Sequence, residues 1–344
     1  MSGTDSQFCD EVCPPVGRGK IVATVVLTLA VVLVANAASW LYLRTHAINP
    51  TNFVLREKWR LLRDLEAPVD TLVLGDSSGS RSLLPAMLEE GLGGRALNVS
   101  TIAAMLTVAE AWMLEEYIDR FGPPRRVLIS HSYDVWCRPY HAFLDEQLME
   151  AGFSRDQAMA ARPARLWTHL QVLGVRLKQA FPLYAQPTSL RKLVTTPWSL
   201  ESPQHAGLGP KGFLHIDLPS PEQVRAERRH HVRWLEQSEA EPFAFQDLNL
   251  EGLRAIDSMA TEHGFPVFLI DAPLFEGLVA EPVWRRHYAQ IRAVLEQFVA
   301  AANQMQLLFP GPVGFGSDQM ENVNHLTATA ARDWTARVLE RVKG

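Results

Sequence analysis

Thr71-Leu-Val-Leu-Gly-Asp-Ser-Ser-Gly-Ser-Arg81 is the stretch that decides the fold of this chain. Its first four residues are β-branched or leucine, and they run without alternation into Gly75-Asp76-Ser77. A continuous apolar run of this kind is typical of a strand that is covered on both faces, as in a parallel α/β sheet. The carboxyl end of such a strand is where open α/β sheets place their chemistry.

Two interpretations of the Gly-Asp-Ser turn are open. Ser77, at a glycine-bounded turn, is a candidate nucleophile. Alternatively, Asp76 or Ser77 only caps the next helix, because a side-chain oxygen at that position accepts hydrogen bonds from free backbone N–H groups. The choice between these two interpretations depends on whether the rest of the chain supplies a base for Ser77.

Four further short apolar segments predict strands, at Ala96–Val99, Arg126–Ile129, Pro266–Ile270 and Leu307–Phe309. Amphipathic helices are expected at 83–90, 103–120, 248–263, 283–305 and 327–342. Strands and helices therefore alternate, which argues for βαβ units. The sequence predicts an α/β fold of three layers, α/β/α, with a mostly parallel five-stranded sheet.

Composition excludes several classes of protein. An apolar content of 47% and a charged content of 21% are ordinary for a globular protein. A net charge of −5 gives no reason to expect nucleic acid as a partner, since that would call for a basic patch. The three cysteines, Cys9, Cys13 and Cys137, make no disulfide framework, and neither a metal nor a cofactor is expected.

The N-terminal part predicts a membrane segment. After a polar tail at 1–20, which we expect to be disordered, residues 21–43 are almost entirely apolar. A helix of this length spans roughly 34 Å, enough for the ~30 Å hydrocarbon core. We predict an uncleaved transmembrane anchor at 21–43. A cleaved signal peptide is the alternative, because Ala35-Asn-Ala37 has the small-x-small pattern.

The remaining chain divides into a connector and one large domain. Residues 44–69 are predicted as a partly helical juxtamembrane connector, and 70–344 as the main domain. Within it, about 140–245 is an expected insertion of helices, at 157–180 and 226–237, and of loops rich in proline, glycine and serine. His230 and His231 are adjacent and so do not share a helix face, which favours a solvated surface over a metal site.

A serine nucleophile needs a base within reach and a group that orients the base. His325 follows the last predicted strand, in Glu321-Asn-Val-Asn-His-Leu-Thr327. Because the carboxyl ends of parallel strands share one edge, we expect His325 and Ser77 to meet there. On its own His325 would be a capping or packing residue, and the pairing with Ser77 favours the catalytic role.

These motifs resemble the SGNH (GDSL-type) hydrolase superfamily. Four blocks carry the resemblance: Leu72–Pro85, Leu97-Asn-Val-Ser100, Gly264–Leu274 and Asn324–Ala331. They are similar to the membrane-anchored envelope branch, which includes the D-alanyl-lipoteichoic acid protein and the alginate O-acetylation proteins. The resemblance covers roughly residues 70–135 and 245–340 and leaves the middle of the chain unmatched.

The resemblance implies roles for individual residues. Ser77 matches the nucleophile and His325 the base. The backbone N–H of Ser77 would be one oxyanion donor, and Asp76, Asn98 and Ser100 are the other expected oxyanion or substrate-binding residues.

Two positions depart from the family pattern. Residues 100–104 lack the usual glycine, and Asn322 stands where the family has the aspartate that orients the histidine. In a serine protease, that exchange costs about 10⁴ in turnover. Either another carboxylate orients the histidine, with Asp318 the nearest candidate and Glu321 a weaker one, or the enzyme is slow, or it no longer catalyses.

The resemblance implies serine-dependent acyl transfer or ester hydrolysis. The group transferred or removed would be an acetyl group, and the substrate would be a cell-envelope or exported polysaccharide. Such a protein would be a single-pass protein of the inner membrane with an extracytoplasmic catalytic domain. It would work beside a membrane-bound O-acyltransferase. The alternatives are a catalytically lapsed protein that binds a glycan or a partner, and a periplasmic esterase of small esters.

Overall fold

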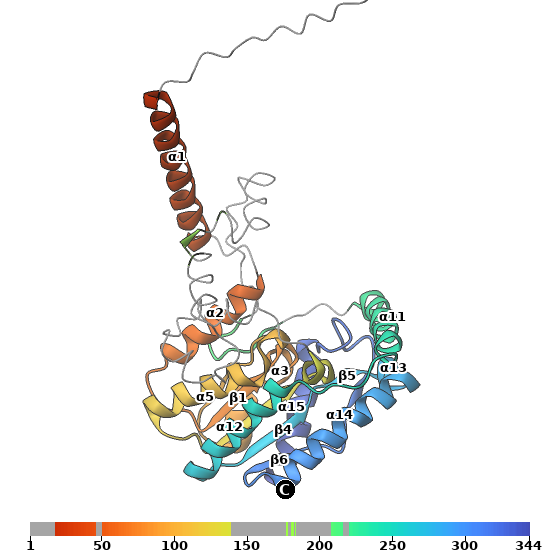
Figure 1. The fold of residues 1–344 in the computed structure, drawn as a ribbon. Coiled ribbons are helices and arrows are strands. Elements are labelled where there is room, and N and C mark those ends of the chain that lie inside the picture. The colour runs from red at the N-terminus through yellow and green to blue at the C-terminus, as the bar shows by residue number, and fades with distance from the viewer. Residues whose placement is uncertain are drawn as a thin grey trace, which may run out of the picture. The chain divides into compact units, whose positions relative to one another are not determined.

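The computed structural model describes residues 18–45, 50–138, 208–215 and 220–344, together with Leu177, Ala180, Phe181 and Leu183 (Figure 1). The chain forms two compact units. The first comprises residues 1–48 and 176–202, and the second comprises residues 49–175 and 203–344.

In the first unit, helix α1 spans Arg18–Thr45. Its segment Gly19–Leu41 is 23 residues long, and among the described helices it is the only one long and apolar enough to cross a membrane. A signal sequence near an N-terminus has the same length and composition. The predicted apolar helix at 21–43 is therefore present. Residues 1–17 of the expected tail lie outside the described residues.

The second unit is built on a five-stranded sheet with the order β2-β1-β3-β4-β6. Its strands are β1 (Thr71–Gly75), β2 (Ala96–Asn98), β3 (Arg126–His131), β4 (Val267–Asp271) and β6 (Met305–Leu307), and all neighbours are parallel. Every residue of β1 is buried, as its unbroken apolar run predicts. The predicted parallel sheet is confirmed.

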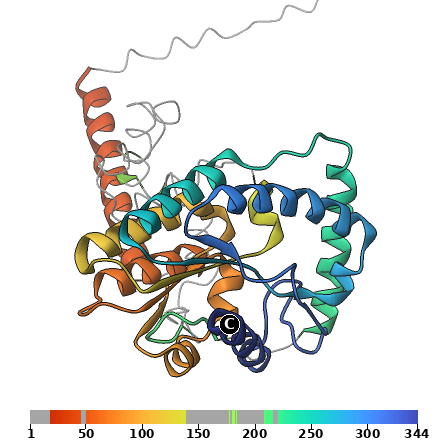
Figure 2. The same cartoon turned by 90° about the horizontal axis from the view of Figure 1, so that it is seen from below.

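Helices cover both faces of this sheet, as Figure 2 shows from one end. One face carries α5 (Leu106–Phe121), α12 (Asp247–His263) and α14 (Pro282–Ala301). The other carries α3 (Ser77–Ser82), α4 (Pro85–Leu92) and α15 (Ala328–Lys343), where α15 packs on both α3 and α4. This is the expected three-layer α/β/α arrangement.

The remaining elements are short or lie at the edge of the unit. They are α2 (Pro50–Arg63), the 3₁₀ turns η1 (Ala103–Met105) and η2 (Tyr133–Cys137), α11 (Pro221–Ser238), α13 (Glu276–Val279), and the parallel pair β5 (Leu274–Phe275) with β7 (Gly314–Phe315). The pair β5–β7 was not predicted, because two residues carry no periodic signal.

Some boundaries differ from the predicted ones. The fifth strand is Met305–Leu307 and not Leu307–Phe309, and α14 ends at Ala301 because the chain turns into that strand. The short helix α3 was not predicted as an element of its own. The helix expected at 157–180 lies outside the described residues, apart from Leu177 and Ala180.

Residues 208–215, which we call the 208–215 loop, are a described part of the expected insertion. An antiparallel bridge between Leu208 and Leu214 closes the loop. The carbonyl of Lys211 accepts a hydrogen bond from the N–H of Asn98 (2.9 Å), and the N–H of Leu214 donates to the carbonyl of Ser80 (2.8 Å). These backbone contacts place the loop against the end of β2 and against α3.

Candidate active site

Ser77 lies at the turn that follows β1. Gly75 ends the strand with φ +140°, and a Cβ at this position would lie 2.0 Å from the carbonyl oxygen of Ser130. Only glycine fits both the dihedral angle and the close approach to the neighbouring strand. The chain then turns so that Ser77, which is half-buried, becomes the first residue of α3.

Asp76 is completely buried beneath this turn. One carboxylate oxygen accepts hydrogen bonds from the N–H groups of Ser78 (2.8 Å) and Gly79 (3.3 Å). The other accepts from the N–H (3.0 Å) and the hydroxyl (2.8 Å) of Ser132. Asp76 therefore caps α3 and joins it to the end of β3. Both of its carboxylate oxygens are buried and accept hydrogen bonds from the protein, so Asp76 is not placed as the oxyanion or substrate-binding residue expected from the sequence. Of the two residues considered for the helix cap, Asp76 is the one that caps α3.

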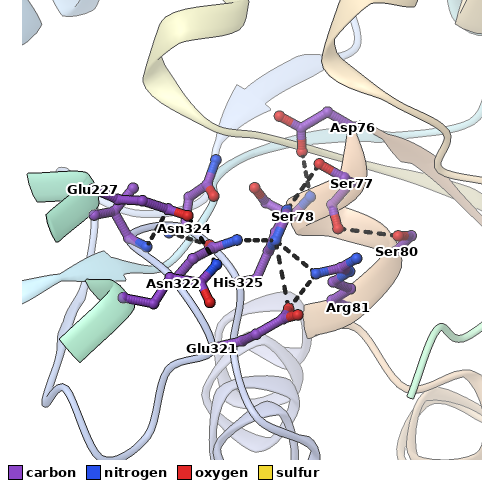
Figure 3. A network of polar contacts seen from close by, with 12 residues as sticks. Asp76, Ser77, Ser78, Ser80, Arg81, Glu227, Glu321, Asn322, Asn324 and His325 are labelled. Atoms are coloured by element: carbon purple, nitrogen blue, oxygen red, sulfur yellow. Dashed lines mark hydrogen bonds and ion pairs between the residues drawn. The ribbon is translucent and has the colours of Figure 1, made fainter. Parts of the chain in front are cut away.

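His325 is held in a short loop between β7 and α15. A bridge between Met320 and Leu326 closes the loop, and the N–H of Glu321 donates to the carbonyl of His325 (2.9 Å). Nε2 of His325 lies 2.9 Å from Oγ of Ser77, across 248 positions of sequence (Figure 3). The side chain of His325 is 12% exposed. The structure thus brings the two predicted catalytic residues into hydrogen-bond contact.

The other ring nitrogen of His325 faces two nitrogen atoms. Nη1 of Arg81 and Nδ2 of Asn322 each lie 2.7 Å from Nδ1. A carboxylate oxygen of Glu321 lies 3.8 Å from the same nitrogen and is paired with Arg81. Asp318 is exposed and makes no hydrogen bond or ion pair with His325. Of the two carboxylates considered from the sequence, Glu321 is the one that lies beside His325. The closed loop holds the two residues next to each other, with the N–H of Glu321 bonded to the carbonyl of His325.

Burial governs the charge state of the site. Burial lowers the pKa of His325 well below its usual range, and the Arg81 guanidinium lowers that pKa further. Burial raises the pKa of Glu321, against the attraction of Arg81. His325 is therefore a neutral imidazole at neutral pH, which is the form that a general base needs.

Asn98 and Ser100 are fully buried beside α3. Nδ2 of Asn98 donates to the carbonyls of Gly79 and Leu83, at 3.0 Å each, and Oδ1 accepts from the N–H of Ser100 (3.0 Å). The hydroxyl of Ser100 is buried and has no hydrogen-bond partner among the described residues. The Asn98 amide and the Ser100 N–H are occupied, so these two groups are not free oxyanion donors, whereas the Ser100 hydroxyl keeps an unused donor. Asn98 instead fixes the position of α3.

Arg81 and Ser132 belong to the site but were not among its predicted residues. Arg81 lies four positions after Ser77, and this spacing places both side chains on one face of α3. Ser132 follows β3, the parallel neighbour of β1, so the sheet order predicts that it ends near Asp76. The hydroxyl of Ser132 also contacts Asp134 (2.5 Å), which extends the network behind the turn.

Three other described histidines, His131, His230 and His231, lie outside this site. His131, at the end of β3, forms a buried pair with Glu110 of α5 (2.8 Å). His230 is exposed, whereas Nδ1 of His231 contacts the hydroxyl of Tyr133 (2.7 Å). In the part of the chain that the structure describes, no group of three or more His, Cys, Asp or Glu side chains is arranged to hold a metal ion.

Comparison with known proteins gives little beyond this geometry. No protein-family model and no curated protein matches the chain. A solved structure described as "a putative platelet activating factor from Streptococcus pneumonia" is similar at a TM-score of 0.38 and 9% identity, over 93% of this chain and 97% of that chain. A similarity this low carries no argument about activity, so the function has to be argued from the site.

Proposed function

We propose that this protein catalyses serine-dependent acyl transfer or ester hydrolysis, with Ser77 as nucleophile and His325 as general base. The observation that carries the proposal is the 2.9 Å contact between Oγ of Ser77 and Nε2 of His325. A hydroxyl is a weak nucleophile until a base within hydrogen-bond reach takes its proton. His325 has that reach, and its lowered pKa keeps the base neutral.

The reaction proceeds in two steps. Oγ of Ser77 attacks the carbonyl carbon of an ester while its proton passes to Nε2 of His325, and that proton then goes to the departing alkoxide. A hydroxyl group or water then attacks the acyl-serine by the reverse route. Asp76 engages the N–H groups of Ser78 and Gly79, which leaves the N–H of Ser77 for the oxyanion that forms in each step.

The substrate class follows from the resemblance in the sequence. We assign an acetyl ester as acyl donor and a cell-envelope or exported polysaccharide as the glycan that gains or loses the group. Helix α1 would anchor the chain in the inner membrane as a single span, with the catalytic domain on the extracytoplasmic side. A membrane-bound O-acyltransferase is the partner that would supply acyl groups across the bilayer.

A second candidate function is binding without catalysis. Asn322 carries no charge, and Nδ1 of His325 faces two nitrogen donors where an active triad has a carboxylate. A protein with this arrangement would use the same site to bind a glycan or the partner acyltransferase.

The test uses the full chain in detergent with an activated acetyl ester. Turnover by the native chain should fall by roughly 10³-fold or more in Ser77→Ala and His325→Ala. Ser258→Ala and His263→Ala, on the exposed side of α12, are matched controls that should keep the native rate. Equal slow turnover by the native chain and both site variants would favour the binding function.

The acceptor decides between the two catalytic classes. An acetylated polysaccharide product that accumulates with added glycan marks a transferase. Release of free acetate at a rate independent of glycan marks the small-ester esterase.

A further inference from the structure

The geometry points to a resting form of this site, in which Arg81 holds His325 as the Nε2–H tautomer, and to Glu321 as the positioning residue that takes over Nδ1 in the working form. This inference rests on the proposed function. In this arrangement Glu321, and not Asn322 or Asp318, is the residue that orients the base.

The resting tautomer follows from the two groups at Nδ1. A guanidinium only donates hydrogen bonds, so Arg81 at 2.7 Å requires Nδ1 to be the acceptor. The Asn322 amide also points a donor at Nδ1, because its Oδ1 is used to accept from the N–H of Asn324 (3.1 Å). With Nδ1 unprotonated, the proton of the neutral ring is on Nε2.

An Nε2–H imidazole donates to Ser77 and does not accept its proton. His325 therefore has to change tautomer before it acts as a base. One proton leaves Nε2 for water and water supplies another to Nδ1, so the net charge does not change. The Nδ1–H form needs an acceptor at Nδ1, and neither Arg81 nor the Asn322 amide in its present orientation provides one.

Glu321 is the group placed to provide that acceptor. Its carboxylate oxygen lies 3.8 Å from Nδ1, and the closed loop keeps its backbone hydrogen-bonded to that of His325. A side-chain movement of roughly 1 Å brings that oxygen to hydrogen-bond distance. Arg81 stays paired with Glu321 during this movement, so the charge of the guanidinium remains neutralised.

Electrostatics favour the same assignment. When Ser77 gives up its proton, His325 becomes an imidazolium, and the positive charge of Arg81 at 2.7 Å opposes it. A carboxylate between the two cations offsets that repulsion. Asp318 is exposed and forms no hydrogen bond or ion pair with His325 or Arg81, and Asn322 carries no charge.

Nitrogen-15 NMR of histidine-labelled full chain in detergent tests the tautomer without any need for turnover. The ring nitrogen shifts distinguish protonated from unprotonated nitrogen, and His325→Gln assigns the signals. We expect Nε2–H in the native chain and a shift of the population to Nδ1–H in the double variant Arg81→Met/Asn322→Leu, which removes both donors that face Nδ1. Arg229→Met, an exposed site on α11, should leave the signals unchanged.

Steady-state kinetics tests the role of Glu321 with one conservative substitution and with a second substitution that should restore activity. Glu321→Gln should lower kcat by about 10²–10⁴-fold with little change in KM, by analogy with loss of the triad aspartate. Adding Asn322→Asp should restore much of that loss, because it returns a carboxylate to the same nitrogen. Asp318→Asn should stay within about twofold of the native rate, since its exposed side chain does not contact His325.

Three outcomes would overturn the inference. The first is an Nδ1–H signal in the native chain, and the second is an unchanged tautomer in Arg81→Met/Asn322→Leu. The third is an active enzyme whose kcat is unaffected by Glu321→Gln. If the native chain has no activity at all, the proposed function fails, while the NMR result still decides the tautomer.

Discussion

The ammonium group of Lys58, on α2, donates a 3.0 Å hydrogen bond to the backbone carbonyl of Asn98 at the end of β2. The same nitrogen donates to the carbonyl of Gly212 in the 208–215 loop. A buried lysine therefore joins α2, the edge of the sheet and a loop that contacts α3. Its charge and its contacts lead to two predictions.

Lys58 should make stability rise with pH. Burial lowers its pKa to about 7, below the ordinary value of 10.5. Between these two values the unfolded chain binds the extra proton, so the free energy of unfolding increases by about 1.4 kcal/mol per pH unit from this residue. Below about pH 7 that contribution is absent. Denaturant titrations at several pH values should show a shallower slope in Lys58→Met, while exposed Lys343→Met keeps the native slope. Equal slopes in both variants would contradict the lowered pKa of Lys58.

Gly212 should be required for the 208–215 loop to pack against Asn98. Its φ is +86°, and a Cβ would lie 1.9 Å from the carbonyl oxygen of Asn98. Gly122 has a similar φ of +77°, and no atom of the described residues lies within 4 Å of its Cβ position. Gly122→Ala should therefore lose about 1–2 kcal/mol of stability from backbone strain alone. Gly212→Ala should lose roughly 1–3 kcal/mol more from the added overlap. Thermal and denaturant unfolding measure both, and indistinguishable losses would argue against the close approach.

Asp76 should matter for stability as well as for the placement of Ser77. Asp76→Asn turns one of its acceptor atoms into a donor, which leaves a buried N–H or hydroxyl of Ser132 or a backbone N–H of α3 unsatisfied. Such a loss costs roughly 1–3 kcal/mol. Asp333→Asn, exposed on α15, is the control and should be neutral. If the two variants unfold at the same denaturant concentration, the cap is not stabilising the turn.

The acid limb of the activity profile should lie well below pH 6.5. Burial and Arg81 both disfavour the imidazolium of His325, so the ring stays neutral as the pH falls through its usual range. The kcat/KM of the native chain should accordingly be flat from neutral pH to below 6.5. Arg81→Met removes one cause of the low pKa and should move the limb to higher pH. A native limb centred at or above 6.5 would refute this charge arrangement.

Local pattern was enough to predict the frame of the molecule. Thr71–Gly75 is an unbroken apolar run, and such a run packs in the middle of a parallel sheet whatever lies elsewhere in the chain. The pairing of Ser77 with His325 was also predictable, because parallel strands bring the loops after them to one edge. These inferences hold since apolar periodicity and chain direction are properties of short segments.

The partners of the polar atoms were settled only by tertiary packing. Nothing local to Asn322, Asp318 or Glu321 says which of them reaches the imidazole, and only the folded loop sets Glu321 and Arg81 beside Nδ1. The sequence likewise does not indicate that the Asn98 amide donates to the carbonyls of Gly79 and Leu83, in α3 and at its C-terminal end. A hydrogen bond requires donor and acceptor within a few tenths of an ångström of one distance. That precision comes from distant segments packed against one another, which a linear pattern does not encode.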